Sequence, residues 1–198
     1  MTTKAALRRV SELRLRETFV HEQRVGALAF ALATYLGLPP ATCAAYRRAA
    51  ELHDIGKIVL PDAVLEKPGP LSAEEFALVQ THTGHGHDIL TASGGTELLL
   101  AAEVALSHHE RWDGSGYPRG LRGTAIPAAA RLVALCDVYA ALREQRSYKA
   151  ALSHEAACHW LLNGGAAAKG FHSDQFDPDL LAVLATTPEV FQSAFTDA

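Results

Sequence analysis

Residues 52–58 read Leu-His-Asp-Ile-Gly-Lys-Ile, and residues 108–118 read His-His-Glu-Arg-Trp-Asp-Gly-Ser-Gly-Tyr-Pro. The first stretch contains the adjacent pair His53 and Asp54, followed by a glycine that can end a helix. The second contains the pair His108 and His109, followed by a glycine-rich loop. Imidazole and carboxylate ligands without thiolates suit catalytic divalent metals. The two stretches therefore predict a metal cluster that hydrolyses a phosphate ester.

The chain around these stretches has helical spacing of apolar residues, abundant alanine and leucine, and few β-branched runs. We therefore expect an all-α fold, with a short helical turn after Pro61 and a glycine-rich loop between 113 and 127. The expected helices cover residues 5–36, with a break near 15, 41–54, 72–80 with a Ser72-x-x-Glu75 capping box, 82–92, 97–108, 128–143, 153–164, and a last helix that begins at Asp177-Pro178.

The composition is that of one ordinary globular domain, with 198 residues and 48% hydrophobic residues. We expect a single compact domain over residues 1–198, with the motifs between about 15 and 185 and no attached sensor domain. A formal net charge of -4 argues against binding to a nucleic-acid duplex. No membrane span is expected, because Pro39-Pro40 ends the most apolar run. Three cysteines without Cys-x-x-Cys spacing suggest reduced thiols and a cytoplasmic location.

Three acidic residues have spacing or surroundings that suit a metal site. Glu17 and His21 are four residues apart, so they share a helix face; a solvated surface pair is the alternative. Asp54 has two oxygens and can bridge two metal ions. Asp137 lies within an apolar helical segment, where a carboxylate must be paired or bound to metal. The spacing alone does not separate a metal ligand from a buried salt bridge at Asp137.

Basic residues near these groups can contact a phosphate. Lys57 follows Asp54 by three positions and can reach a phosphoryl oxygen. Arg146 and Lys149 follow the Asp137 segment in a chain that is acidic overall, so they can clamp a phosphate or a guanine, or form a solvated turn.

Of the histidines at 82, 85 and 87, one or two at most can face a common centre, and His82 shares its face with the one at 85.

These motifs resemble the HD-GYP family, the bacterial cyclic-dinucleotide phosphodiesterases of the HD metallohydrolase superfamily. The resemblance runs from about Glu17 to Leu184, and the name motifs are His53-Asp54 and Gly116-Tyr117-Pro118. Its other markers are Glu17-Thr18-x-x-His21-x-x-Arg24-Val25, the segment 52–60, Lys67-Pro68-Gly69-x-Leu71, Thr81-His82, the segments 108–118 and 131–139, Arg146-x-Tyr148-Lys149 and Phe176-Asp177-Pro178.

The resemblance implies a site with three kinds of residue. The implied metal ligands are Glu17, His21, His53, Asp54, His82, His108, His109 and Asp137. The implied catalytic residues are Asp54 and Lys57, and the implied substrate contacts are Lys57, Arg111, Tyr117, Arg146 and Lys149. The metals are expected to be two or three divalent ions, iron or manganese, with Glu17 serving a third ion.

The activity that the resemblance implies is hydrolysis of cyclic-di-GMP to linear 5′-pGpG, and in a further step to GMP. We expect a hydroxide that bridges two metal ions, beside Asp54, to attack the phosphorus in line with the leaving 3′ oxygen. A diguanylate cyclase, or a separate regulatory protein, is the implied partner. The segment around Gly116-Tyr117-Pro118 shapes the pocket and, in some relatives, the surface for such a partner.

The sequence also departs from the family pattern. Alanine stands at position 140, where the family usually has an aspartate, and Ser147 replaces a usual proline. No expected metal ligand is lost. The alternatives are hydrolysis of another cyclic dinucleotide such as cyclic GMP-AMP, another nucleotide phosphohydrolase or a di-iron oxygenase, and a non-catalytic cyclic-dinucleotide sensor. Turnover by metal-replete protein separates the sensor from the enzymes.

Overall fold

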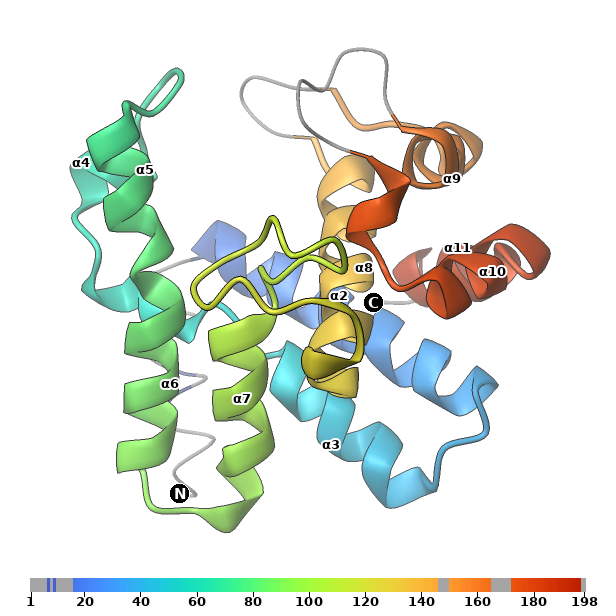
Figure 1. The fold of residues 1–198 in the computed structure, drawn as a ribbon, viewed down its shortest axis with the longest axis horizontal. Helices are drawn as coiled ribbons and strands as arrows, with labels where there is room; N and C mark the ends of the chain where they lie inside the picture. The colour runs from blue at the N-terminus through green and yellow to red at the C-terminus, as the bar shows by residue number, and fades with distance from the viewer. Residues whose placement is uncertain (1–6, 8, 10–15, 146–149, 165–171, 197–198) are drawn as a thin grey trace.

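The fold is all-α, in agreement with the sequence. The computed structural model describes residues 7, 9, 16–145, 150–164 and 172–196, and it contains no strand within them. Its helices are α2 (Arg16–Tyr35), α3 (Pro40–Ala50), α4 (Asp62–Leu65), α5 (Ala73–Gln80), α6 (His82–Ala92), α7 (Leu99–Ser107), α8 (Ala128–Arg143), α9 (His154–Asn163), α10 (Pro178–Thr186) and α11 (Glu189–Thr196), with 3-10 turns η1 (Ile55–Val59), η2 (Thr96–Leu98), η3 (Gly123–Ala125) and η4 (Ser173–Gln175) (Figure 1).

Helix α8 lies in the middle of the molecule, between α7 on one side and α9, α10 and α11 on the other (Figure 1). Its apolar sequence is explained by this position, because most of its side chains are buried. Helix α2 packs against α3 and α8, and α6 packs along α7. The core that joins them includes Leu28 of α2, Val104 of α7 and Leu135 of α8. Burial of these side chains fixes the relative positions of the helices that carry the polar motifs.

The segment that carries His53 and Asp54 differs from the prediction. We expected one helix over 41–54 that ends at a glycine, but α3 ends at Ala50, turns follow, and η1 begins at Ile55. Gly56 does not end a helix. A Cβ atom at this position would lie 1.9 Å from the backbone oxygen of His82 and 2.5 Å from the nitrogen of Gly86. The glycine is therefore required because η1 packs directly against the backbone of α6.

Most of the predicted helix boundaries agree with the structure, and the predicted capping residues lie at them. Ser72 and Glu75 form the capping box of α5, and Ser153 and Asp177 accept backbone hydrogen bonds at the starts of α9 and α10. The prediction that the helix after Asp177 is the last one was wrong. Helix α11 follows it, and the buried ring of Phe191 anchors it against the core.

The glycine-rich segment after α7 crosses the face of the molecule between α7 and α8 (Figure 1). Glu110, which is 3% exposed, holds this loop through its carboxylate. One oxygen accepts the backbone N–H of Arg119 at 2.8 Å, and the other accepts that of Leu121 at 2.9 Å. Near the start of the loop, the backbone N–H of Trp112 donates to the backbone oxygen of Gln175 at 2.9 Å. The loop is therefore an ordered wall beside the histidine pair.

Replacement of Glu110 by alanine is expected to destabilise the protein by about 2 kcal/mol or more, because two backbone donors lose their buried acceptor at ~1–3 kcal/mol each. Urea unfolding measures this change. Limited proteolysis should show new cleavage near Leu121 while the helices stay protected. Glu103→Ala is the control, because that exposed carboxylate only approaches the Arg119 side chain, at 3.8 Å. Equal stability of the two variants would contradict the role given to Glu110.

Two further expectations concern the whole described chain. None of its helices combines the length and apolar character that crossing a membrane requires. The three cysteines, Cys43, Cys136 and Cys158, are unpaired and buried, as the sequence predicted.

Candidate metal centre

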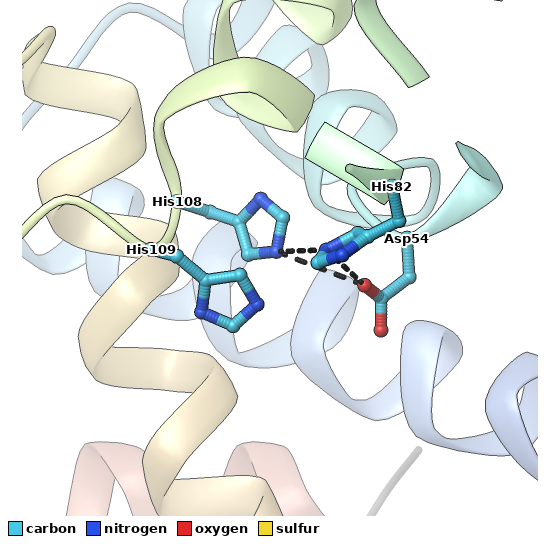
Figure 2. A group of neighbouring side chains, drawn as sticks. All are labelled: Asp54, His82, His108 and His109. Atoms are coloured by element: carbon cyan, nitrogen blue, oxygen red, sulfur yellow. Dashed lines mark hydrogen bonds and ion pairs between the residues drawn. The ribbon is translucent and has the colours of Figure 1, made fainter. Parts of the chain in front are cut away.

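Four side chains from three separate segments form a first group of candidate ligands (Figure 2). Asp54 comes from the turn before η1, His82 begins α6, and His108 and His109 follow α7. Each offers a ligand atom, and these atoms lie within 4.8 Å of one another. Three imidazoles and one carboxylate in this arrangement suit a divalent transition-metal ion.

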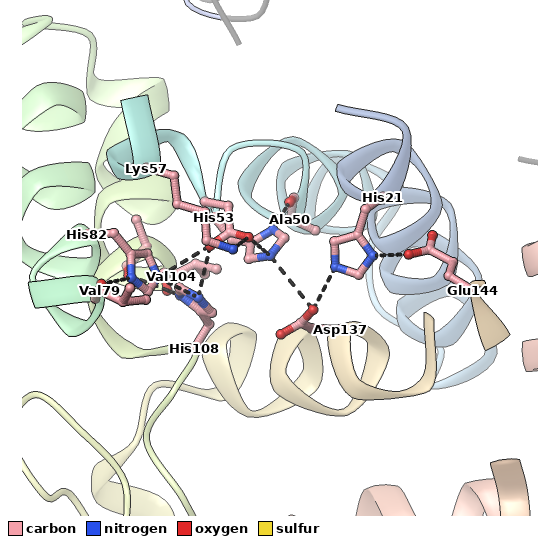
Figure 3. Close-up of polar contacts among 12 residues, drawn as sticks. His21, Ala50, His53, Lys57, Val79, His82, Val104, His108, Asp137 and Glu144 are labelled. Atoms are coloured by element: carbon pink, nitrogen blue, oxygen red, sulfur yellow. Dashed lines mark hydrogen bonds and ion pairs between the residues drawn. The ribbon is translucent and has the colours of Figure 1, made fainter. Parts of the chain in front are cut away.

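Three more side chains form a second group beside the first. His21 comes from α2, His53 from the turn after α3, and Asp137 from the middle of α8, with ligand atoms again within 4.8 Å of one another. The Nε2 atom of His21 lies 2.7 Å from Oδ1 of Asp137, and the Nε2 atom of His53 lies 3.9 Å from the same oxygen (Figure 3). The groups are neighbours because His53 and Asp54 are consecutive.

Asp54 is placed between the two groups. Its Oδ1 atom lies 3.3 Å from Nε2 of His82 and 3.7 Å from Nε2 of His108, both in the first group. Its Oδ2 atom lies 3.4 Å from Nε2 of His53, in the second group, and 2.5 Å from Nζ of Lys57. Each oxygen of one carboxylate therefore faces a different group, which is the position that a bridging ligand requires.

Backbone carbonyls orient three of the imidazoles (Figure 3). The Nδ1 atoms of His53, His82 and His108 lie 2.7, 2.6 and 3.0 Å from the backbone oxygens of residues 50, 79 and 105, respectively. Because a carbonyl only accepts, each Nδ1 carries the proton and each Nε2 points to the centre. This is the arrangement in which neutral histidine binds a metal.

Two buried atoms at the junction of the groups make no hydrogen bond with any described residue. They are Nε2 of His53 and Oδ1 of Asp54, whose residues are 0% and 3% exposed. A buried polar atom without a partner is costly, and such atoms are rare in native proteins. A divalent cation in each group would satisfy these atoms, Oδ1 of Asp54 in the first group and Nε2 of His53 in the second, so the residues present fit a metal centre.

The protonation of the first group also suits metal binding. Burial lowers the pKa of His108 to about 4, against the opposing effect of its contact with Asp54. Burial, and next the neighbouring His108, hold the pKa of His109 well below its usual value. These imidazoles are neutral near pH 7, and neutral imidazole is the form that binds a metal. Burial alone would raise the pKa of Asp54, but Lys57 and His53 hold it well below its usual value, so the carboxylate is charged.

The second group is charged differently. Burial alone would lower the pKa of His21, but hydrogen bonds to Asp137 and Glu144 raise it to about 9. Burial alone would raise the pKa of Asp137, and the hydrogen bond from His21 instead lowers it well below its usual value. In the metal-free protein His21 is therefore a cation that is paired with two carboxylates. Its positive charge balances these carboxylates, as the charge of a bound metal ion otherwise would.

The structure brings seven of the eight sequence-predicted metal ligands into these groups. Glu17 lies in α2, but its side chain is outside the described part of the structure, as are Arg146 and Lys149. The exposed His85 and the half-buried His87 are in neither group, so one histidine of that cluster, His82, enters the centre. The sequence left two interpretations of Asp137, a metal ligand and a buried salt bridge. The structure fits both, because the carboxylate that could bind metal is ion-paired with His21.

Of the predicted substrate contacts, Tyr117, Arg111 and Lys57 lie in the described part of the chain, beside the first group. Tyr117 stacks on His109 with ring centroids 4.8 Å apart and planes at 29°. Burial, and next the charges of Asp54 and Asp137, raise the pKa of the Tyr117 hydroxyl, so it stays protonated and can donate a hydrogen bond. Arg111 lies in the same loop, half-buried, with Nη1 3.5 Å from Oγ of Ser115. Lys57 contacts Asp54, as described above.

Sequence reasoning missed Glu144. Its Oε2 atom lies 2.9 Å from Nδ1 of His21, and its Oε1 atom accepts a hydrogen bond from Nη1 of Arg24 at 3.0 Å. Helical spacing from Asp137 gives no signal for it, because Glu144 directly follows α8 and has an extended backbone. The buried Ala140, at which the family pattern expects an acid, lies on α8 between Asp137 and the end of the helix.

Comparison with known proteins shows the family of the chain. The family model described as HD domain matches residues 6–167. A Thermotoga maritima protein named cyclic di-GMP phosphodiesterase is 47% identical over 143 residues, which are 72% of this chain and 39% of that protein. A Vibrio cholerae protein named 3'3'-cGAMP-specific phosphodiesterase 2 is 42% identical over 173 residues, 87% of this chain and 32% of that protein.

A solved structure shows the same fold. It is described as an HDG"Y"P protein from Bdellovibrio bacteriovorus, and it matches with a TM-score of 0.60 and 22% identity over 89% of this chain and 51% of that chain. The chain spans about a third to two fifths of the length of the two curated relatives. The chain belongs to the HD domain family, and the predicted resemblance to its HD-GYP members is confirmed.

Proposed function

We propose that this chain is a metal-dependent phosphodiesterase that hydrolyses cyclic-di-GMP to linear 5′-pGpG, and in a further step to GMP. The observation that carries the proposal is the pair of ligand groups, with one oxygen of Asp54 facing each. Two relatives whose names describe cyclic-dinucleotide phosphodiesterases support the substrate class. HD-domain metallohydrolases use divalent metals, and the residues present fit such ions.

The ligands that we propose are Asp54, His82, His108 and His109 for one ion and His21, His53 and Asp137 for the other, with Asp54 between them. When bound, the metals would supply Lewis acidity at the phosphoryl group and an activated water. These two ions are the minimum, and Glu17 would serve a third ion where one is bound. A ligand set without thiolates favours iron or manganese over a structural zinc.

The chain's own side chains would bind and orient the substrate around this centre. Lys57 has its amine beside Asp54 and a quarter of its side chain exposed, so it can hold a phosphoryl oxygen at the rim of the centre. The protonated hydroxyl of Tyr117 can donate to a phosphate or a base, and Arg111 lies in the same loop. Arg146 and Lys149 complete the proposed contacts as a cationic clamp.

The proposal also covers the domain organisation, the location and the partner of the chain, and a second candidate substrate. We propose that the chain forms one catalytic domain and that it lies in the cytoplasm. The three unpaired cysteines favour this location. A diguanylate cyclase or a separate regulatory protein as partner stays a prediction. Cyclic GMP-AMP is the second candidate substrate, because one relative's name specifies it.

The experiment that tests this function is turnover of cyclic-di-GMP and cyclic GMP-AMP by protein purified without oxygen and reconstituted with iron or manganese. We expect linear 5′-pGpG or GMP from cyclic-di-GMP with metal, and no product after removal of metal by a chelator. Activity on cyclic GMP-AMP alone would change the substrate. Activity that persists at full metal depletion would refute the metal-dependent mechanism, and binding without turnover by metal-replete protein would identify a sensor.

A further inference from the structure

We propose that Glu144 is a positioning residue that holds His21 in the tautomer and orientation needed for the second ligand group. This inference rests on the proposed metal centre. Glu144 contributes no ligand atom to either group. Its contact with His21 nevertheless determines how tightly the second group binds its metal ion.

The first argument is the contact itself. The His21 side chain is buried, and each ring nitrogen meets a carboxylate: Nδ1 lies 2.9 Å from Oε2 of Glu144, and Nε2 lies 2.7 Å from Oδ1 of Asp137 (Figure 3). A carboxylate accepts hydrogen bonds, so Nδ1–H donates to Glu144. When Nε2 gives up its proton to bind a metal, this contact keeps the remaining proton on Nδ1.

The second argument is a comparison within the site. His53, His82 and His108 have their Nδ1 atoms fixed by backbone oxygens three residues earlier in the chain. His21 has in that role the carboxylate of Glu144, which directly follows α8 and is distant in the sequence. A carboxylate acceptor makes the imidazole a stronger ligand than a carbonyl does, and it can be removed by mutation.

The third argument is that Glu144 is itself held in place. Its side chain is 11% exposed, and its second oxygen accepts a hydrogen bond from Nη1 of Arg24 at 3.0 Å. The guanidinium of Arg24 in turn lies 5.0 Å from the ring centroid of Phe195, on α11. One oxygen of Glu144 therefore faces the histidine and the other faces a supported cation, so the carboxylate cannot turn freely. The late helix α11, which the sequence prediction omitted, thereby supports the metal centre.

The consequence of losing the carboxylate follows from these contacts. Without Glu144, the Nδ1 atom of His21 has no fixed acceptor, and the ring can rotate or carry its proton on Nε2. Loss of such an outer partner lowers metal affinity by roughly 10- to 100-fold in metal sites generally. The first group does not contact Glu144, so its affinity should not change.

The test compares Glu144→Ala, Glu144→Gln and Arg24→Met in the full chain, with metal number and affinity measured by chelator competition with Mn²⁺. We expect the wild-type protein to bind two ions. In Glu144→Ala, one ion should bind roughly 10- to 100-fold more weakly and the other as before. Glu144→Gln should restore part of the loss, since its amide oxygen still accepts from Nδ1. Arg24→Met keeps the histidine contact and should have the smaller effect.

A spectroscopic readout separates positioning from a general loss of stability. In Zn²⁺-loaded protein labelled with ¹⁵N, the Nδ1–H proton of His21 should give a slowly exchanging signal in the wild type and in Glu144→Gln, but not in Glu144→Ala. Thermal unfolding of the metal-free variants checks the fold. Unchanged affinity for both ions and an unchanged signal in Glu144→Ala would overturn the inference. A wild-type protein that binds no ion would instead refute the proposed centre itself.

Discussion

Replacement of Asp54 by alanine is expected to remove metal binding from both ligand groups and to abolish turnover. The reason is that its two oxygens face different groups, with His82 at 3.3 Å from Oδ1 and His53 at 3.4 Å from Oδ2. Loss of an outer partner of a metal ligand costs roughly 10- to 100-fold in affinity, so loss of a ligand shared by two ions must exceed that. Metal content and cyclic-di-GMP turnover are measured on the same sample.

The matched control is Asp88→Ala. Asp88 is also a carboxylate, but its side chain is 82% exposed and contacts His87 rather than either group. This variant should keep full metal content and activity. Circular dichroism shows whether Asp54→Ala keeps its helices. If the folded Asp54→Ala protein held both ions with wild-type affinity, the bridging position of this carboxylate would have no function.

Replacement of Gly56 by alanine is expected to produce the largest loss of stability, about 3 kcal/mol or more. The added Cβ atom would lie 1.9 Å from the backbone oxygen of His82 and 2.5 Å from the nitrogen of Gly86. Both atoms are backbone, so relief requires η1 and α6 to separate. Such a shift moves Asp54 away from His82, and metal content should fall with stability. Urea unfolding and metal analysis measure the two effects.

Gly84→Ala is the control for this substitution. Gly84 lies on the same helix as His82, and a Cβ atom there would meet no atom within 4 Å. Because alanine favours a helix interior over glycine, this variant should be as stable as the wild type or more stable, by up to about 1 kcal/mol. A Gly56→Ala protein as stable as Gly84→Ala would show that η1 does not pack on α6 as described.

The histidines of the two groups could be predicted from the sequence because their separated motifs resemble those of the HD-GYP family. The helices of their segments were also predictable, since capping residues such as Ser72 and Asp177 act locally. Neither signal shows which ligands meet. The division into two groups depends on how α2, α6, α7 and α8 pack, and the pattern along one helix carries no such information.

The errors have the same origin. Gly56 looked like a helix end, but the contact that requires glycine comes from α6, about thirty residues later in the chain. Glu144 looked like an ordinary acid in a polar segment, and its function appears only when α2 brings His21 beside it. Helix α11 is short, and the burial of Phe191 that stabilises it is a tertiary contact. Local patterns cannot report such contacts.

The most direct test of the central claim is a crystal structure of the manganese-loaded protein with anomalous diffraction at the manganese edge. The account predicts two anomalous peaks, one within the group of Asp54, His82, His108 and His109 and one within the group of His21, His53 and Asp137, with the Asp54 carboxylate between them. Manganese bound elsewhere, or only one peak with Asp54 turned away from it, would contradict the account.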